Sequence, residues 1–146
     1  MRLVLFFVLL FFLDRLSKTI VFQSYAFFNE MMLIEPFLSL QLAINYGAAW
    51  GFFSHQRWLL ISTHFIALFF VFYYWKSLKR GYWTAQSLPF LLAGIFGNGF
   101  DRIKYGFVID FIKVGSFPIF NFADIYLTFT GFCFLMAIWK GDEFFR

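Results

Sequence analysis

The stretch FADIYLTFTGFCFLMAIW, residues 122–139, decides the fold class of this chain. Its only charged side chain is Asp124 near the start, and its length approaches the roughly 20 residues that a helix needs to cross a bilayer. Further apolar stretches occur at about residues 3–22, 58–75 and 82–100. We therefore predict an all-α membrane protein with four transmembrane helices.

The composition favours a membrane environment for the chain. Of its 146 residues, 62% are hydrophobic and 14% are charged, whereas soluble domains carry about 25% charged residues. A soluble domain of this size would leave roughly a third of its surface in water. The length fits one membrane domain over residues 1–146. The net charge of +4 accompanies no nucleic-acid-binding pattern, so we expect no nucleic acid partner.

Basic residues beside the apolar stretches predict the orientation, because such residues favour the cytoplasmic side. They are Arg2, Lys76, Lys79, Arg80, Lys140 and Arg146. With four spans all of them fall on one side, together with both termini, and segments 23–57 and 101–121 face outward. Asp14, Arg15 and Lys18 interrupt the first stretch and no small-residue cleavage site follows, so we interpret it as an uncleaved helix rather than a secretory signal.

The two outward segments carry strand patterns. FLSLQLAIN, residues 37–45, alternates in part between apolar and polar side chains, which predicts a strand pair or a half-buried sheet lying on the membrane. Gly47 and Gly51 would end it. FVIDFI, residues 107–112, predicts a further short strand.

Polar residues from separate segments meet at the outward face. Ionisable residues at membrane depth are costly and are usually functional or paired. Asp14 and Lys18 are four apart on a helix, so we expect an ion pair, with support of a site as the alternative. The other polar residues placed at this face are Asn98, Asp101, Arg102, Asp110, Asn121 and Asp124. For Arg102 the interpretations are a headgroup contact or a structural or substrate-anchoring role, and the neighbouring carboxylates favour the latter.

Asp110 and Asp124 are the predicted catalytic pair. Alone, an Asp at a helix start is more often a cap. Two carboxylates a few Å apart in one dry pocket cannot both ionise, however, so one keeps a proton. The ionised member takes a proton from water, and the protonated member donates to the peptide carbonyl or the leaving amine. This aspartyl-protease chemistry needs no metal, cofactor or covalent intermediate.

Other protease mechanisms lack their residues. The sequence has no His-Glu-x-x-His and no Gly-x-Ser-x-Gly, and His55 and His64 are expected to be interfacial or packing residues. The single cysteine, Cys133, can form neither an internal disulfide nor a metal cluster. Two rival functions stay open. A proton-coupled transporter or channel subunit would spread polar residues across the membrane, and a non-catalytic assembly subunit would tolerate loss of either aspartate.

Five motifs carry a resemblance to a known family. They are DRLSK at 14–18, NYGAAWG at 45–51, GNGFDR at 97–102, GFVIDF at 106–111 and FPIFNFAD at 117–124. In this order, on four spans, they resemble the motifs of the bacterial lipoprotein signal peptidases, or signal peptidase II. The chain departs from the family at Trp50, where Phe is usual, at Ile125, where Ser is frequent, and in a short stretch between Asp110 and Asp124.

The resemblance implies an intramembrane aspartyl endopeptidase that removes signal peptides from prolipoproteins, cutting before a diacylglyceryl-modified Cys. It implies a small extracytoplasmic β-cradle, a mobile loop over the active site, and a location in the bacterial cytoplasmic (inner) membrane with the active site at the outer leaflet. The expected partners are the modified prolipoprotein and membrane lipids, and the expected state is a monomer. The implied catalytic residues are Asp110 and Asp124, with Asp101 second to Asp110 as a partner. The implied substrate-binding residues are Asn45, Asn98, Arg102 and Asn121. The implied supporting residues are Asp14, Lys18, Gly47, Asp101 and Ala123.

Overall fold

The computed structural model describes residues 2–24, 30–48 and 51–145. Residues 25–29 of the first outward segment, residues 49–50 of the 45–51 motif, including Trp50, and Arg146 lie outside the described residues. The elements in chain order are α1 (Arg2–Gln23), β1 (Met31–Ile34), β2 (Leu38–Asn45), α2 (Arg57–Tyr73), α3 (Trp75–Leu78), α4 (Tyr82–Lys104), β3 (Val108–Val114), α5 (Phe122–Lys140) and the 3-10 turn η3 (Glu143–Phe145).

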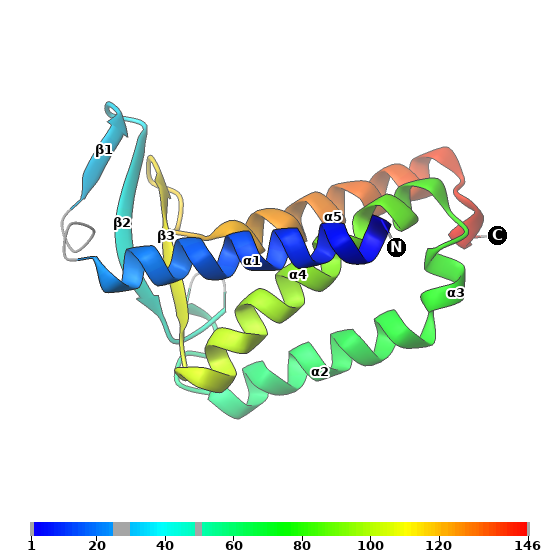
Figure 1. Cartoon of the computed structure of the whole chain (residues 1–146), viewed down its shortest axis with the longest axis horizontal. Helices are drawn as coiled ribbons and strands as arrows, with labels where there is room; N and C mark the ends of the chain where they lie inside the picture. The colour runs from blue at the N-terminus through cyan, green and yellow to red at the C-terminus, as the bar shows by residue number, and fades with distance from the viewer. Residues whose placement is uncertain (1, 25–29, 49–50, 146) are drawn as a thin grey trace.

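Helix α4 is the centre of the helical part, because it packs against α1, α2 and α5 (Figure 1). Small residues allow its close approach to α5, as is common where helices pack in membranes. A Cβ added at Gly94 would lie 2.5 Å from Leu127 Cγ and 2.9 Å from the Ala123 carbonyl oxygen. Both termini lie toward the end of the molecule away from the sheet.

The three strands form one antiparallel sheet in the order β1-β2-β3, which confirms the strand patterns seen in both outward segments. The sheet crosses the ends of the helices (Figure 1), and β3 contacts α1 and α4. In the register of β2 and β3, Ala43 lies opposite Asp110 and Asn45 opposite Val108. The sheet therefore brings Asp110 over the ends of the helices and Asn45 beside it.

The helix bounds differ from the predicted ranges at two places. Helix α2 ends at Tyr73, and the separate short helix α3 follows it within the apolar stretch that ends at Trp75. Helix α4 continues past Phe100 to Lys104, because Asp101 and Arg102 are buried inside the protein (0% and 8% exposed). The apolar stretch stops before the last turn of α4, because that turn carries polar side chains that bind inside the protein. The end of the stretch therefore does not mark the end of the helix.

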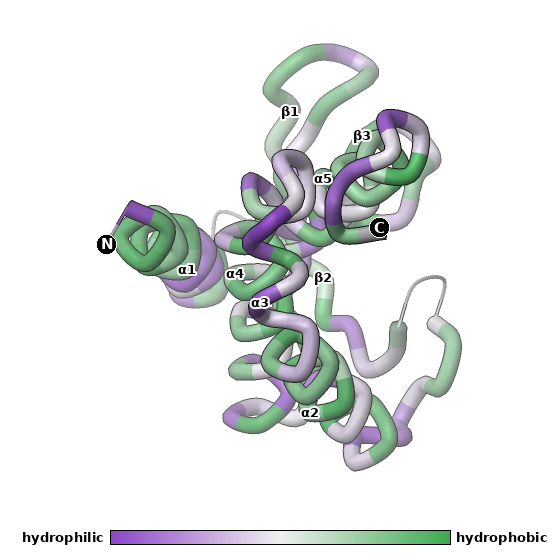
Figure 2. The backbone as a smooth tube through the Cα atoms, turned by 90° about the vertical axis from the view of Figure 1, so that its right-hand side faces the viewer, coloured by the Kyte–Doolittle hydropathy of each residue, from purple (hydrophilic) through white to green (hydrophobic). Residues whose placement is uncertain are grey.

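The chain is mostly helical, and hydrophobic residues, drawn in green, make up much of its helices (Figure 2). Exposed side chains on three helices include Leu13, Phe69, Phe72 and Leu135. In the part of the chain that the structure describes, α5 alone is both long and apolar enough to cross a membrane by length and composition, and α2 is a shorter apolar helix. Helix α1 carries Asp14, Arg15 and Lys18 in its second half, which lowers its hydropathy. Four spans stay a prediction.

Candidate active site

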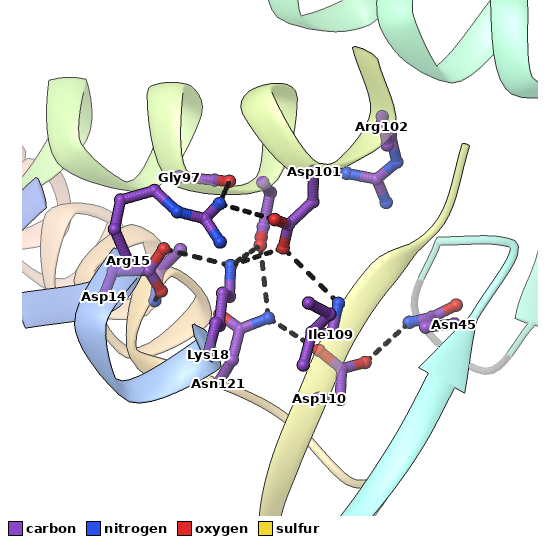
Figure 3. A network of polar contacts seen from close by, with 12 residues as sticks. Asp14, Arg15, Lys18, Asn45, Gly97, Asp101, Arg102, Ile109, Asp110 and Asn121 are labelled. Atoms are coloured by element: carbon purple, nitrogen blue, oxygen red, sulfur yellow. Dashed lines mark hydrogen bonds and ion pairs between the residues drawn. The ribbon is translucent and has the colours of Figure 1, made fainter. Parts of the chain in front are cut away.

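Lys18 is the centre of a buried polar cluster where α1 meets α4. Its ammonium group lies 3.1 Å from Asp14 Oδ2 and 3.0 Å from Asp101 Oδ2, and all three side chains are fully buried. The ion pair with Asp14 is the one that the sequence predicts. Lys18 Nζ also donates to Asn98 Oδ1 at 3.0 Å (Figure 3). Lys18 therefore pairs with two buried carboxylates and also binds the side-chain amide of Asn98 on α4.

Asp14 and Asp101 each make further polar contacts besides those with Lys18. Asp14 Oδ1 accepts a hydrogen bond from the backbone N–H of Ala123 at 3.0 Å, which attaches α1 to the first turn of α5. Asp101 Oδ1 is paired with Arg15 at 2.5 Å, and Asp101 Oδ2 accepts from the backbone N–H of Ile109 at 3.4 Å. These contacts place both carboxylates in the framework that joins α1, α4, α5 and β3.

Two asparagines connect this cluster to Asp110 and Asp124. Asn121 Nδ2 donates to Asn98 Oδ1 at 3.1 Å and to Asp110 Oδ1 at 2.6 Å (Figure 3). Asn98 Nδ2 donates to Asp124 Oδ1 at 2.8 Å. A continuous chain of hydrogen bonds thus runs from Lys18 through the two amides to both carboxylates.

Asp124 stands in the first turn of α5 and forms a capping box with Asn121. Asn121 Oδ1 accepts from the Asp124 backbone N–H at 3.0 Å, and Asp124 Oδ2 accepts from the Asn121 backbone N–H at 3.1 Å. Negative charge is favoured at a helix N-terminus by the partial positive charge there. The capping role that an isolated Asp would have is therefore present, and the same carboxylate also faces the cavity.

Asp110 lies on β3 and is 2% exposed. Asn45 Nδ2 donates to Asp110 Oδ2 at 2.9 Å, so both carboxylate oxygens accept from amides. Burial, together with the charge of Asp124, raises the pKa of Asp110 to about 7, although the bonds from Asn45 and Asn121 oppose the shift. Both carboxylates line the same cavity, and both accept hydrogen bonds from Asn121, Asp110 from its side chain and Asp124 from its backbone N–H.

A cavity of about 770 Å³ opens beside these residues, between the sheet, α4 and α5. Its polar lining includes Asn45, Asn98, Arg102, Asp110 and Asp124. Much of the remaining wall is apolar and includes Ala43, Val108, Leu127 and the segment 117–120.

Arg102 fixes the turn that follows β2. Its Nη2 donates to the Gly47 carbonyl at 2.8 Å, and the Gly47 N–H donates to Asn45 Oδ1 at 2.9 Å. Arg102 Nη1 lies 3.3 Å from His64 Nε2. A Cβ on Gly47 would lie 2.8 Å from the Phe52 carbonyl oxygen, so glycine is needed there by close packing. The turn thereby positions Asn45 against Asp110.

The predicted site residues fall into two groups. Asn45, Gly47, Asn98, Arg102, Asp110 and Asp124 line the cavity. Asp14, Lys18, Asp101, Asn121 and Ala123 are buried in the hydrogen-bonded framework behind it. Asp101, the second candidate for the dyad, is thus tied to Arg15 and Lys18 rather than turned into the cavity.

Two residues that contribute to the site were not predicted from the sequence. The first is Arg15, which pairs with Asp101 and whose charge at membrane depth could have marked it as part of the site. The second is His64, which contacts Arg102, a contact that its place in an apolar stretch does not reveal. Across residues 2–24, 30–48 and 51–145, no group of three or more His, Cys, Asp or Glu side chains is arranged to hold a metal ion.

Comparison with known proteins gives consistent similarities. The family model for signal peptidase (SPase) II matches residues 6–140. The lipoprotein signal peptidase of Streptococcus agalactiae serotype Ia is 35% identical over 139 residues, which cover 93% of this chain and 90% of that protein. That of Syntrophomonas wolfei is 38% identical over 133 residues, covering 90% and 89%. A structure described as "Bacterial membrane enzyme structure by the in meso method at 2.3 A resolution" has a TM-score of 0.89 at 28% identity, over 95% of this chain and 88% of that one.

Proposed function

The chain belongs to the signal peptidase II family, a bacterial membrane peptidase of the aspartic type that removes signal peptides from prolipoproteins, and we propose that Asp110 and Asp124 are its catalytic pair. The observation that carries this proposal is that both carboxylates line one cavity and are joined through Asn121. We further propose that cleavage falls before the diacylglyceryl-modified Cys, and that the enzyme acts as a monomer.

The environments of the two carboxylates suggest separate roles. Asp110 is buried with its pKa raised to about 7, so it holds the shared proton near neutral pH. Asp124 caps α5 and lines the cavity, and we assign it the role of the base. The Asp124 carboxylate takes a proton from water, and the water oxygen bonds to the scissile carbonyl carbon while Asp110 protonates the carbonyl oxygen. One hydroxyl of the resulting diol then returns its proton to Asp110 as the carbonyl re-forms, while the C–N bond breaks and the amine of the Cys takes the proton held by Asp124. Both side chains are thereby restored to their starting protonation.

The rate of cleavage should therefore fall at alkaline pH. Because Asp110 must be protonated to act as the acid, and its pKa is about 7, kcat/KM for a lipid-modified precursor should decline as pH rises through about 7. The measurement is the pH dependence of kcat/KM with purified enzyme in neutral detergent. A rate that stays constant from neutral to strongly alkaline pH would contradict this role for Asp110.

We propose an orientation with the sheet at the outer leaflet and four spans, with both termini in the cytoplasm. The basic residues of the α2–α4 link support it, because Lys76, Lys79 and Arg80 lie at the end of the molecule opposite the sheet. Non-helical backbone at this depth is tolerated where it is buried in protein or lines a wet cavity, and the sheet borders the cavity.

The lipid on the substrate should contribute strongly to cleavage. Withdrawing acyl chains from the bilayer costs about 0.8 kcal/mol per CH₂, so a membrane-anchored precursor is held at the depth of Asp110 and Asp124. We expect the same precursor without the diacylglyceryl group to show a kcat/KM lower by more than about tenfold, where 1.4 kcal/mol equals a factor of ten. Equal rates on matched precursors with and without the lipid would show that this anchoring argument is wrong.

A further inference from the structure

A second cavity lies at the end of the molecule opposite the active site, between the start of α4 and the end of α5. Its volume is about 480 Å³, within the range of small-molecule sites. The lining residues that matter here are Lys79, Arg80, Trp83, Lys140, Asp142 and Glu143. Figure 2 looks onto this end of the molecule, where α3 and the C-terminus lie in front.

The charge balance in this cavity is positive. Lys79, Arg80 and Lys140 are exposed, and none of them forms an ion pair with a described residue. The Asp142 carboxylate is 8% exposed and already bound, because its Oδ2 accepts from the Trp83 N–H at 2.9 Å and its Oδ1 from the Phe144 N–H at 3.2 Å. Glu143 is the other carboxylate in the lining. The three cations thus outnumber the two carboxylates of the lining, and backbone N–H groups already bind one of these, Asp142.

Two of these cations lie over aromatic rings. Lys79 Nζ lies 5.6 Å from the ring centroid of Trp75, and Lys140 Nζ lies 4.2 Å from that of Trp139. Trp139 is 73% exposed. Exposed Trp beside Lys is typical of the membrane–water interface, where the ring lies at the level of the lipid headgroups. Below this level, Leu135 and Ile138 of α5 are 67% and 60% exposed and offer an apolar surface.

We propose that this cavity binds the phosphodiester headgroup of an anionic phospholipid, with Lys79, Arg80 and Lys140 as the phosphate contacts. Charge-assisted hydrogen bonds from Lys and Arg to phosphate are strong, and basic pockets between helices on the cytoplasmic side suit anionic lipid headgroups. The acyl chains lie along the apolar surface of α5. The proposal rests on the orientation given above only in assigning the lipid to the cytoplasmic leaflet.

The test compares two double variants that lose the same charge. Lys79→Gln/Lys140→Gln changes this cavity, and Lys104→Gln/Lys113→Gln changes two basic residues at the sheet end of the molecule. The thermal unfolding midpoint of each purified protein is measured in phosphatidylcholine nanodiscs with and without phosphatidylglycerol. Because a ligand that binds the folded state stabilises it, phosphatidylglycerol should raise the midpoint of the wild type and of the Lys104/Lys113 variant. The rise should be lost in the Lys79/Lys140 variant.

Equal responses of the two double variants would overturn the proposal. Inorganic phosphate is the second probe, and a stabilisation by phosphate equal to that by the lipid would also overturn it, since the site would then be one for a free anion. Native mass spectrometry, which counts retained phosphatidylglycerol molecules, should find fewer on the Lys79/Lys140 variant than on its control. These readouts do not involve cleavage, so their failure is separate from any failure of the catalytic assignment.

Discussion

Replacing Asp110 or Asp124 by Asn should reduce cleavage of a lipid-modified precursor by about 10²–10⁴-fold, the usual contribution of general acid–base catalysis. Asn is close to Asp in shape but neither takes a proton from water nor delivers one. Both substitutions keep an oxygen that can accept from the neighbouring amides of Asn45, Asn98 or Asn121. The measurement is the initial cleavage rate of each purified variant, with its thermal unfolding recorded to show that it is folded.

The matched control for this experiment is Glu35→Gln, which removes an exposed carboxylate from the β1–β2 turn on the same side of the molecule. It should cleave at the wild-type rate. Full activity of either purified Asp variant would reject the assignment of Asp110 and Asp124 as the catalytic pair.

Replacing Lys18 by Met should cause the largest loss of stability in the chain. The substitution leaves Asp14 fully buried without its cation and leaves Asp101 with Arg15 alone. Removing one member of a buried ion pair typically costs about 3–5 kcal/mol, because the other charge is left uncompensated. We expect a reduction of that order in the free energy of unfolding, measured by denaturant or heat in detergent or lipid.

Lys113→Met is the control for Lys18→Met. Lys113 lies 3.0 Å from Glu30, the same distance as Lys18 from Asp101, but its side chain is 32% exposed and that of Glu30 is 35% exposed. Water solvates the Glu30 carboxylate that is left behind, so the free energy of unfolding should barely change. Similar losses in the two variants would mean that the buried cluster does not hold α1 to α4 as described.

The sequence predicted the helices better than it predicted the side-chain contacts between them. Apolar stretches gave the four long helices to within a few residues, since α1, α2 and α5 expose apolar side chains along most of their length. The topology also predicted which helix ends would carry polar residues to one face. It gave the height of each residue along its helix but not its direction around the axis, so the pairing of Arg15 with Asp101 was out of reach.

The sheet shows a second limit of the sequence. Partial alternation predicted β2, and the run FVIDFI predicted β3. The contact between Asn45 and Asp110 depends, however, on the register of the two strands and on an irregularity between Leu40 and Ala43. A shift of one residue would turn Asp110 to the other face of the sheet. The raised pKa of Asp110 likewise depends on burial and on Asp124, which is distant in the sequence. Only the family resemblance marked Asn45 as a site residue, whereas Asp110 and Asp124 were also predicted from their placement at one membrane face.

The central claim, that Asp110 and Asp124 act as one unit, is tested most directly by the residual cleavage rate of the double variant Asp110→Asn/Asp124→Asn beside the two single variants. Residues that act together in one step give losses that do not multiply. Our account predicts that the double variant is no slower than the slower single variant. Losses that multiply, or a single variant that cleaves the lipid-modified precursor at the wild-type rate, would contradict it.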